Sequence, residues 1–409
     1  MEAFFLSPYL ILTIAGILGL FMAWGIGAND VANAMGTSVG SKALTLKQAI
    51  IIAAIFEFLG AYLAGGEVTS TIRKGIVDPQ LYANDLNIFI IGMMSSLLAA
   101  GFWLYIASNK GWPVSTTHSI VGAIVGFVLI TKGIDAVSWF TVGEIASSWI
   151  TSPLIAGILA FFIYLSAKKL IIDAKNQVTA AIFYIPFYSF FVAGVIAQVI
   201  ARKGLSHIGL TWSDNEIWFF TALIALLTGG LTSLALRLSK ESISSKGGIE
   251  YAFGILMIVT ACAMAFAHGS NDVANAIGPL AAIISVVNSS DLSSTAPINP
   301  AILLLGGAGI VLGLSTLGYK VIKTVGEKIT KLTPSLGFSA EMAAASTVVF
   351  ASYLGFPIST THTLIGGVIG VGLANSAKDV DWSSVYRIFA SWIITIPIGA
   401  VFTLSLIHI

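Results

Sequence analysis

The sequence is poor in charged residues. Only 10% of its 409 residues are charged, against about 25% in an ordinary soluble domain, whereas 56% are hydrophobic. Twenty Lys and Arg balance nineteen Asp and Glu, so neither a nucleic acid nor an anionic surface is indicated as a partner. A soluble fold could not cover its surface with so few charges. The composition therefore predicts a polytopic membrane protein in contact with lipid.

Cysteine and the common catalytic motifs are also scarce. Cys262 is the single cysteine, which excludes a disulfide framework and a cysteine-based metal site. Neither a Gly-x-x-x-x-Gly-Lys-Ser/Thr string nor a His-Glu-x-x-His string occurs. Ser115 and His118 form the one nucleophile–base pair, but they share a helical turn and no acid orients them. We therefore predict neither an enzyme nor a bound cofactor.

Apolar runs of about 18 to 25 residues without period-2 alternation fit spanning helices rather than barrel strands. Several runs have the wrong length for one crossing. Runs 119–131 and 363–375 are too short, and run 251–287 is too long and is interrupted by the string HGSND. Such runs are typical of broken helices and re-entrant hairpins. The sequence predicts an all-α membrane protein with about 12 membrane segments.

Two strings occur twice in the same order and at nearly the same offset. Asn-Asp-Val-Ala-Asn-Ala occupies 29–34 and 271–276, and Pro-x-Ser-Thr-Thr-His occupies 113–118 and 357–362. Ordered repetition of this kind indicates duplicated structural units. The predicted organisation is a first transmembrane repeat, a two-helix linker and a second transmembrane repeat, at 5–165, 166–249 and 250–409.

The distribution of basic loops permits an inverted arrangement of the two repeats. Loop 288–300 has no Lys or Arg, whereas 320–331 has four lysines. Under the positive-inside rule, a basic segment 37–47 on the inside places the N-terminus outside the cytoplasm. The basic loops that can share the cytoplasmic side are 168–175, 237–246 and 320–331.

The first repeated string places a carboxylate inside the membrane or at its edge. A carboxylate at the bilayer centre costs about 2.5–3.5 kcal/mol, so it usually faces a cavity or a partner. The asparagines three or four positions away share its helix face, and hard cations such as sodium prefer these oxygen ligands. The alternative is that these residues only cap helix ends. The predicted sodium ligands are Asn29, Asp30, Asn33, Asn271, Asp272 and Asn275.

The second repeated string suggests an anion site. Its proline ends an incoming helix, and its hydroxyl residues begin an outgoing one. Free N–H groups and the positive end of the helix dipole at such a start favour an anion. The alternative is a pair of capped turns at the membrane surface. The predicted oxyanion-binding residues are Ser115, Thr116, Thr117, Ser359, Thr360 and Thr361.

The other charged residues and the histidines in the spans allow more than one interpretation. Glu144 and Arg387 hold the same place in the two halves, so an ion pair between them is one interpretation. His118 and His362 lie beside the predicted anion site. Two interpretations apply to both, a structural role and a role in binding. His268 precedes the second Asn-Asp-Val-Ala-Asn-Ala string and has no counterpart in the first half. The intramembrane carboxylates left without a role are Glu57 and Glu341.

The doubled Gly-Ala/Ser-Asn-Asp-Val-Ala-Asn-Ala and Pro-Val/Ile-Ser-Thr-Thr-His strings resemble the signature of the inorganic phosphate transporter (Pit) family. The resemblance covers nearly the whole chain and implies an inverted-repeat symporter of phosphate with sodium or protons. It implies that the predicted anion site cradles phosphate. Animal relatives carry a long loop between the halves, which is reduced here to 238–250. The residues implied to hold the coupling cations are Asp30, Asn33, Asp272 and Asn275.

The leading hypothesis is a secondary active transporter of the plasma membrane that imports phosphate with sodium. Phosphate must enter against an inside-negative potential worth about 2.3 kcal/mol per charge and 100 mV, and bound cations offset that cost. We expect cations to bind first and alternating access to occur around a midplane site. Coupling to protons, sulfate as the anion, and an anion channel are the alternatives. The sequence is also compatible with a homo-oligomer.

Overall fold

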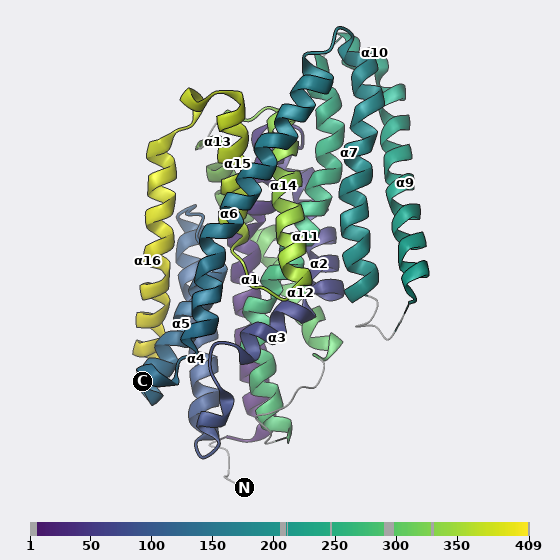
Figure 1. Cartoon of the computed structure of the whole chain (residues 1–409). Helices are drawn as coiled ribbons and strands as arrows, with labels where there is room; N and C mark the ends of the chain where they lie inside the picture. Colours follow the sequence, from purple (N-terminus) through teal and green to yellow (C-terminus); the bar gives the residue numbers. More distant parts are fainter. Residues whose placement is uncertain are drawn as a thin grey trace.

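The computed structural model describes residues 6–204, 210, 212–245, 248–289, 298–328 and 331–407 (Figure 1). Throughout these ranges the regular structure is helical, apart from an isolated bridge between Val77 and Val137. Eight of the helices are long and apolar enough to span a membrane. A ninth candidate span, formed by α12 and the start of α13, is bent by 66°. The prediction of an all-α membrane protein is confirmed.

The first half contains two long helices, a short one, a helical hairpin and a final long helix. Its α-helices are α1 (Pro8–Gly40), α2 (Leu46–Ala64), α3 (Gly66–Lys74), α4 (Leu86–Asn109), α5 (Thr116–Lys132) and α6 (Trp139–Ala167). Its 3₁₀ turns are η1 (Pro79–Tyr82) and η2 (Ile134–Ala136).

The second half repeats this order of elements. Its helices are α11 (Gly248–Ser289), α12 (Pro300–Thr316), α13 (Gly318–Lys328), α14 (Pro334–Tyr353), α15 (Thr360–Asn375), η5 (Ala377–Asp379) and α16 (Trp382–Ile407). Between the halves lie η3 (Lys168–Ile172), α7 (Gln177–Val199), η4 (Ile200–Gly204), α9 (Asp214–Leu238) and α10 (Lys240–Ser245). Of these, η3 and η4 are single π-helical turns.

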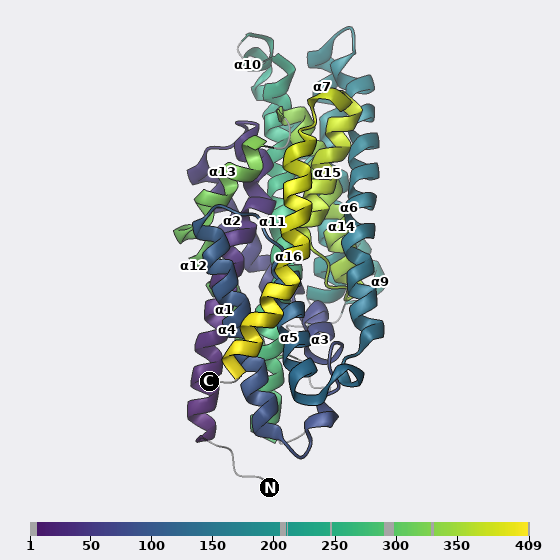
Figure 2. The same ribbon diagram turned by 90° about the vertical axis from the view of Figure 1, so that its left-hand side faces the viewer.

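The first long helices of the two halves run in opposite directions through the molecule. In Figure 1, α1 rises from the N-terminal end at the bottom, whereas α11 descends from α10 at the top. The halves also exchange partners, because α1 packs on α12, α11 on α2, α5 on α16 and α6 on α15. Figure 2 shows the same interleaving from the side, with α16 beside α5. Residues from both halves therefore meet at the centre.

The two hairpins enter from opposite ends of the molecule. In Figure 1, α4 and α5 occupy the lower part and α14 and α15 the upper part. The chain reverses at residues 110–115, which we call the first tip, and at 354–359, the second tip. Gly111 has a φ of +67° and Gly355 a φ of +75°, a conformation that side chains other than glycine rarely adopt. The hairpins fit the re-entrant elements that the short apolar runs predicted.

The string HGSND does not break the second long helix, contrary to our expectation for run 251–287. Helix α11 continues from Gly248 to Ser289 through this string and through Pro279. His268 and Asp272 bond to side chains from other helices, so their polarity does not require an interruption of the backbone. The breaks occur instead at Gly65, between α2 and α3, and at Leu317, between α12 and α13.

Glycines allow the central helices to cross with their backbones in contact. A Cβ atom on Gly27 would collide with the carbonyl oxygen of Ile310, and one on Gly269 with the carbonyl oxygen of Glu57. Close approach through small residues is a common mode of helix packing in membranes. These two crossings, of α1 on α12 and of α11 on α2, position the site described below.

A substitution at one crossing should test this packing. We expect Gly27→Ala to lower the stability of the detergent-solubilised protein by about 1–3 kcal/mol, because the added methyl group meets backbone that cannot move aside. Gly16→Ala in the same helix is the control, since nothing lies within 4 Å of a Cβ there. Thermal unfolding of both variants measures the difference. Equal midpoints for the two variants would contradict the close crossing.

Candidate functional site

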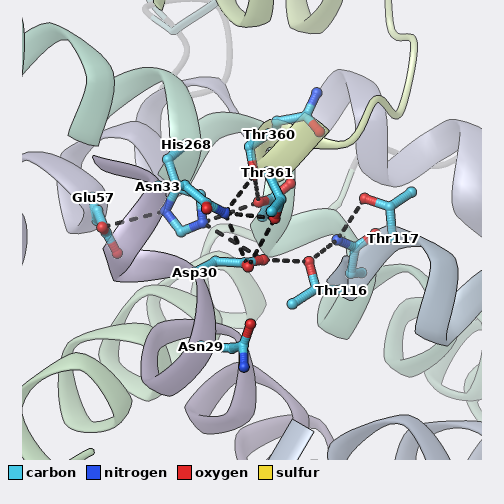
Figure 3. A network of polar contacts seen from close by, with 12 residues as sticks. Asn29, Asp30, Asn33, Glu57, Thr116, Thr117, His268, Thr360 and Thr361 are labelled. Carbon is cyan, nitrogen blue, oxygen red and sulfur yellow. Dashed lines mark hydrogen bonds and ion pairs between the residues drawn. The ribbon is translucent and has the colours of Figure 1, made fainter. Parts of the chain in front are cut away.

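The residues of both repeated strings meet in the interior, where α5 and α15 begin beside the middle of α1 and α11 (Figure 3). Thr116 donates a hydrogen bond to Oδ2 of Asp30 at 2.7 Å, and Thr360 donates to Oδ2 of Asp272 at 2.6 Å. All four side chains are at most 2% exposed. Each aspartate therefore bonds to the hairpin of its own half.

The second asparagine of each string reaches the hairpin of the other half. The amide nitrogen of Asn33 donates to Thr361 at 2.8 Å and to Asp30 at 3.0 Å. The amide nitrogen of Asn275 donates to Thr116 and Thr117, both at 3.2 Å. The starts of α5 and α15 and both long helices are thus joined in one polar network.

The hydroxyl residues begin the two hairpin helices as the sequence indicated. Ser115 is the N-cap of α5 and accepts from the backbone N–H of His118, and Ser359 does the same for His362 in α15. The first-turn N–H groups of a helix have no partner within it. Both serines are 1% exposed, so the alternative of capped turns at the membrane surface does not fit.

Asn29, the first asparagine of the first string, lies apart from the aspartates. Figure 3 places Asn29 away from the network around Asp30. Its amide nitrogen donates to Ser108 and to the carbonyl of Trp112, and its oxygen accepts from the N–H of Val114. Asn29 therefore fastens the first tip to α1.

Asn271 makes a similar attachment to the second tip but leaves one atom without a partner. Its amide nitrogen donates to Ser352 at 3.1 Å and to the carbonyl of Phe356 at 3.2 Å. The side-chain oxygens of the second half that accept no hydrogen bond, although buried, are Asn271 Oδ1, Asp272 Oδ1 and Asn275 Oδ1. Buried oxygens without a donor are costly unless a cation or another group satisfies them.

His268 lies at the centre of the network, a position that our sequence reasoning missed. Its Nε2 is 3.0 Å from Oδ2 of Asp272 and 4.0 Å from Oδ2 of Asp30, while its Nδ1 is 3.3 Å from Oε1 of Glu57. All four side chains are buried. His268 and Asp272 are four residues apart on one helix face, a spacing that could have revealed their pairing. The contact of His268 with Glu57 joins two helices that are distant in sequence, so no local spacing indicates it.

The pairing of His268 with Glu57 exists at only one of the two glycine crossings. At the α11–α2 crossing, His268 precedes Gly269, which contacts the backbone of Glu57. At the α1–α12 crossing, an isoleucine precedes Gly27, and Gly27 contacts the backbone of Ile310. The polar pair is therefore replaced there by two isoleucines, and the two aspartates differ in their surroundings.

The network holds more acidic than basic groups. Three carboxyl groups, those of Asp30, Glu57 and Asp272, face one imidazole. The ligand atoms of Asp30, His268 and Asp272 lie within 4.8 Å of one another. A buried cluster of this kind needs cations for compensation. The arrangement can hold small cations directly beside two helix starts suited to an anion.

The remaining histidines of the repeated strings face away from this network. Nδ1 of His118 lies 3.2 Å from the carbonyl of Trp392, and Nδ1 of His362 lies 3.1 Å from the carbonyl of Trp149. Each ring packs on a tryptophan. A structural role, which joins each hairpin to the last helix of the other half, fits both.

The predicted ion pair between Glu144 and Arg387 is wrong. In the part of the chain that the structure describes, Arg387 donates to Ser384 and makes no ion pair with Glu144. Because the halves exchange partners, α6 packs with α14 and α15 and α16 with α4 and α5, so the two residues line different cavities.

Glu341, the other carboxylate without a predicted role, is buried in α14. It accepts hydrogen bonds from the hydroxyl groups of Thr37, Ser38 and Thr260, which belong to α1 and α11. These bonds tie α14 to both long helices, outside the network around Asp30.

Comparisons with known proteins agree on one family. Residues 26–403 match the model of the phosphate transporter family. The chain is 48% identical to the "Putative phosphate permease" of Haemophilus influenzae, over 97% of this chain and 96% of that protein. It is 43% identical to "Inorganic phosphate transporter 2-1, chloroplastic" of Arabidopsis thaliana, over 96% of this chain and 70% of that protein. A solved structure, "The sodium-dependent phosphate transporter", is similar with a TM-score of 0.90 and 40% identity, covering 97% and 98% of the two chains.

Proposed function

This chain belongs to the phosphate transporter family, whose members are membrane transporters rather than enzymes, and we propose that it imports inorganic phosphate by symport with sodium. The observation that carries the proposal is the buried negative cluster of Asp30, Asp272 and Glu57 beside two hydroxyl-rich helix starts. The cluster suits cations and the helix starts suit an oxyanion. Symport requires both kinds of site.

In this proposal the coupling sodium ions bind at the two aspartates. Asp272 and Asn275 each have a buried oxygen that accepts no hydrogen bond, and Asn271 has a third. Oxygens of this kind suit sodium. In the first half, Asp30 and Asn33 hold the corresponding positions, where Oδ1 of Asp30 accepts from the Asn33 amide at 3.0 Å. Asn29 we assign to the attachment of the first tip, because both atoms of its amide already bond there.

Phosphate is proposed to lie between the two helix starts, held by the hydroxyl groups of Ser115–Thr117 and Ser359–Thr361. Thr116 and Thr360 donate to Asp30 and Asp272, so the anion-binding and cation-binding groups share hydrogen bonds. Without bound cations, the negative aspartates would repel the phosphate, because the threonine hydroxyl groups that hold it also bond to the aspartates. Cations therefore bind before phosphate, and their release evicts it.

The arrangement of the helices supports a membrane placement for this mechanism. The α6–α7 turn and α10, which carry basic residues, lie at the top of Figure 1, and the N-terminus lies at the bottom. We propose that the top faces the cytoplasm of the cell and that the repeats are inverted, as the opposite directions of α1 and α11 suggest. Alternating access would then occur as one repeat bundle rocks against the other.

Proton coupling is the second candidate, and the same aspartates would carry the protons. The unpartnered amide oxygens of Asn271 and Asn275 favour sodium, because protons need no additional oxygen ligands. The similarity to a sodium-dependent phosphate transporter supports the same choice.

Phosphate binding by the purified protein tests the proposed order of binding. We expect radiolabelled phosphate to bind in sodium buffer and not in choline buffer at the same pH, because the uncompensated carboxylates repel it. Sulfate in excess should compete weakly. Phosphate binding that is equally strong in both buffers would contradict the role of sodium.

One hydroxyl substitution tests the phosphate site itself. We expect Thr361→Val to weaken phosphate binding roughly 10- to 100-fold, since a hydrogen bond to a charged group contributes about 1.5–3 kcal/mol. Thr403→Val is the matched control, because that hydroxyl group bonds only to the carbonyl of Gly399 within α16. Equal phosphate affinities in the two variants would show that the Thr361 hydroxyl group does not bind phosphate.

A further inference from the structure

Two cavities lie on the outer sides of the two tips, at positions related by the sequence repeat. The cavity at the first tip, which we call the Arg387 cavity, has a volume of about 570 Å³ and the one at the second tip, the Glu144 cavity, about 480 Å³. Each lies between the first helix of a hairpin and the last helix of the other half. The walls of the Arg387 cavity include Trp103, Trp112, Thr324, Ser384, Arg387 and Ser391.

The two cavities carry opposite charge. Arg387 lines one and Glu144 lines the other, at the same place in the repeat. Trp112 and Phe356 also correspond, since each precedes the proline of its tip. Neither the Arg387 cavity nor the Glu144 cavity has another charged residue in its lining. The repeat therefore provides two similar cavities, and the Arg387 cavity is the one that suits an anion.

Other cations surround the first tip. The ammonium group of Lys110 lies 4.7 Å from the centre of the Trp112 ring, and Lys320 donates to Asn109 at 3.0 Å. One acid, Asp381, accepts from the Ser384 hydroxyl group and interacts electrostatically with Arg387. At the second tip, in contrast, Lys203 is paired with Glu67 at 3.0 Å.

A single extended segment separates the Arg387 cavity from the central network. Pro113 and Val114 line the cavity, and Ser115 follows them directly. The backbone N–H of Val114 donates to Asn29, and its carbonyl accepts from Thr361 at 3.4 Å. An anion in the cavity would therefore be one layer of backbone away from the proposed phosphate site.

We propose that the Arg387 cavity is a second subsite for a phosphate group, on the cytoplasmic side of the central site, where an imported phosphate leaves that site. The inference rests on the proposed function. The guanidinium group supplies paired N–H donors that match phosphate oxygens, and hydroxyl groups of Ser384, Ser391 and Thr324 lie in the same cavity. The local excess of positive charge raises the concentration of phosphate next to the tip.

Transport kinetics at two ionic strengths test this subsite. In proteoliposomes, Arg387→Gln is expected to lower Vmax/KM roughly tenfold at low ionic strength for phosphate that is supplied on the cytoplasmic side of the protein, and high salt should reduce the difference. Arg387→Lys should recover part of the loss. Glu144→Gln is the matched control, because it removes a charge at the corresponding position and should not lower Vmax/KM. Values within twofold of the unmodified protein at both salt concentrations would overturn the proposal.

Chemical protection gives a second readout that does not depend on transport. In choline buffer, where the central site is proposed to be empty of phosphate, inorganic phosphate should slow the reaction of Arg387 with phenylglyoxal at least threefold. Exposed Arg237 serves as the internal reference for mass spectrometry. Chloride at equal ionic strength should not protect. If the unmodified protein fails to transport phosphate, the proposed function is contradicted. The protection of Arg387 by phosphate then tests the subsite independently of transport.

The same assay distinguishes the two sources of a phosphate group. Protection by inorganic phosphate in lipid-free detergent identifies the free anion as the ligand. Protection only in phospholipid nanodiscs, without added phosphate, identifies a lipid headgroup in the cavity and still supports a phosphate-group subsite. Protection by neither would overturn the subsite.

Discussion

Replacing Asp30 with asparagine is expected to abolish the accumulation of phosphate that a sodium gradient drives. The change keeps the shape of the side chain but removes the charge that holds a cation, and it leaves only one oxygen to accept from Thr116 or Asn33. A contact to a charged group contributes about 1.5–3 kcal/mol, which corresponds to a roughly 10- to 100-fold loss of sodium affinity. The sodium dependence of phosphate uptake into proteoliposomes measures this loss.

Asp272→Asn is expected to have the same effect and an additional one. Asp272 also contacts His268 at 3.0 Å, so its replacement changes the charge balance around Glu57 as well. Asp135→Asn is the control, because Asp135 is exposed in η2, away from the network. Sodium-driven accumulation that survives in either Asp30→Asn or Asp272→Asn would contradict the assignment of that aspartate to a cation site.

The second large effect concerns the His268–Glu57 pair. We expect His268→Ile alone to destabilise the protein by about 3–5 kcal/mol, because it removes the imidazole that Glu57 and Asp272 face in the interior. Glu57→Ile alone should cost less, because His268 stays 3.0 Å from Asp272. The double replacement is expected to recover part of the stability that His268→Ile loses, since it removes the unpaired Glu57 carboxylate and reproduces the isoleucine crossing of α1 on α12. Thermal unfolding of the four proteins in detergent measures the coupling.

Stability and transport should separate in the double variant. It is expected to fold but to lose sodium-driven phosphate uptake, because the arrangement of charge around Asp272 is gone. Ile26→Val, at the position that corresponds to His268, is the control for a small change at a crossing. Destabilisations that simply add in the double variant, or a double variant with normal uptake, would show that the pair has no special role.

The parts of the site that sequence could predict rest on local signals that occur twice. Proline followed by Ser115 or Ser359 marks a helix start through its own capping bond, and the spacing of Asp30 and Asn33 fixes them on one helix face. Repetition then indicated that the two strings act together. The hairpins followed from apolar runs too short to cross a membrane.

The parts that sequence missed depend on contacts between distant helices. Glu57 meets His268 only because α2 crosses α11 at Gly269. Glu144 and Arg387 hold equivalent places, but exchange of partners between the halves separates them into different cavities. The string HGSND resembles a helix break, yet α11 continues through it, and its polar side chains contact other helices, as Asp272 does when it accepts from Thr360.

Radiolabelled phosphate uptake into proteoliposomes, driven in turn by a sodium gradient and by an equal proton gradient, tests the central claim most directly. Sodium-coupled symport predicts concentrative uptake with the sodium gradient alone. Concentrative uptake with the proton gradient alone would contradict sodium coupling and assign protons to the same aspartates. Passive flux without accumulation under either gradient would contradict symport altogether and indicate a channel.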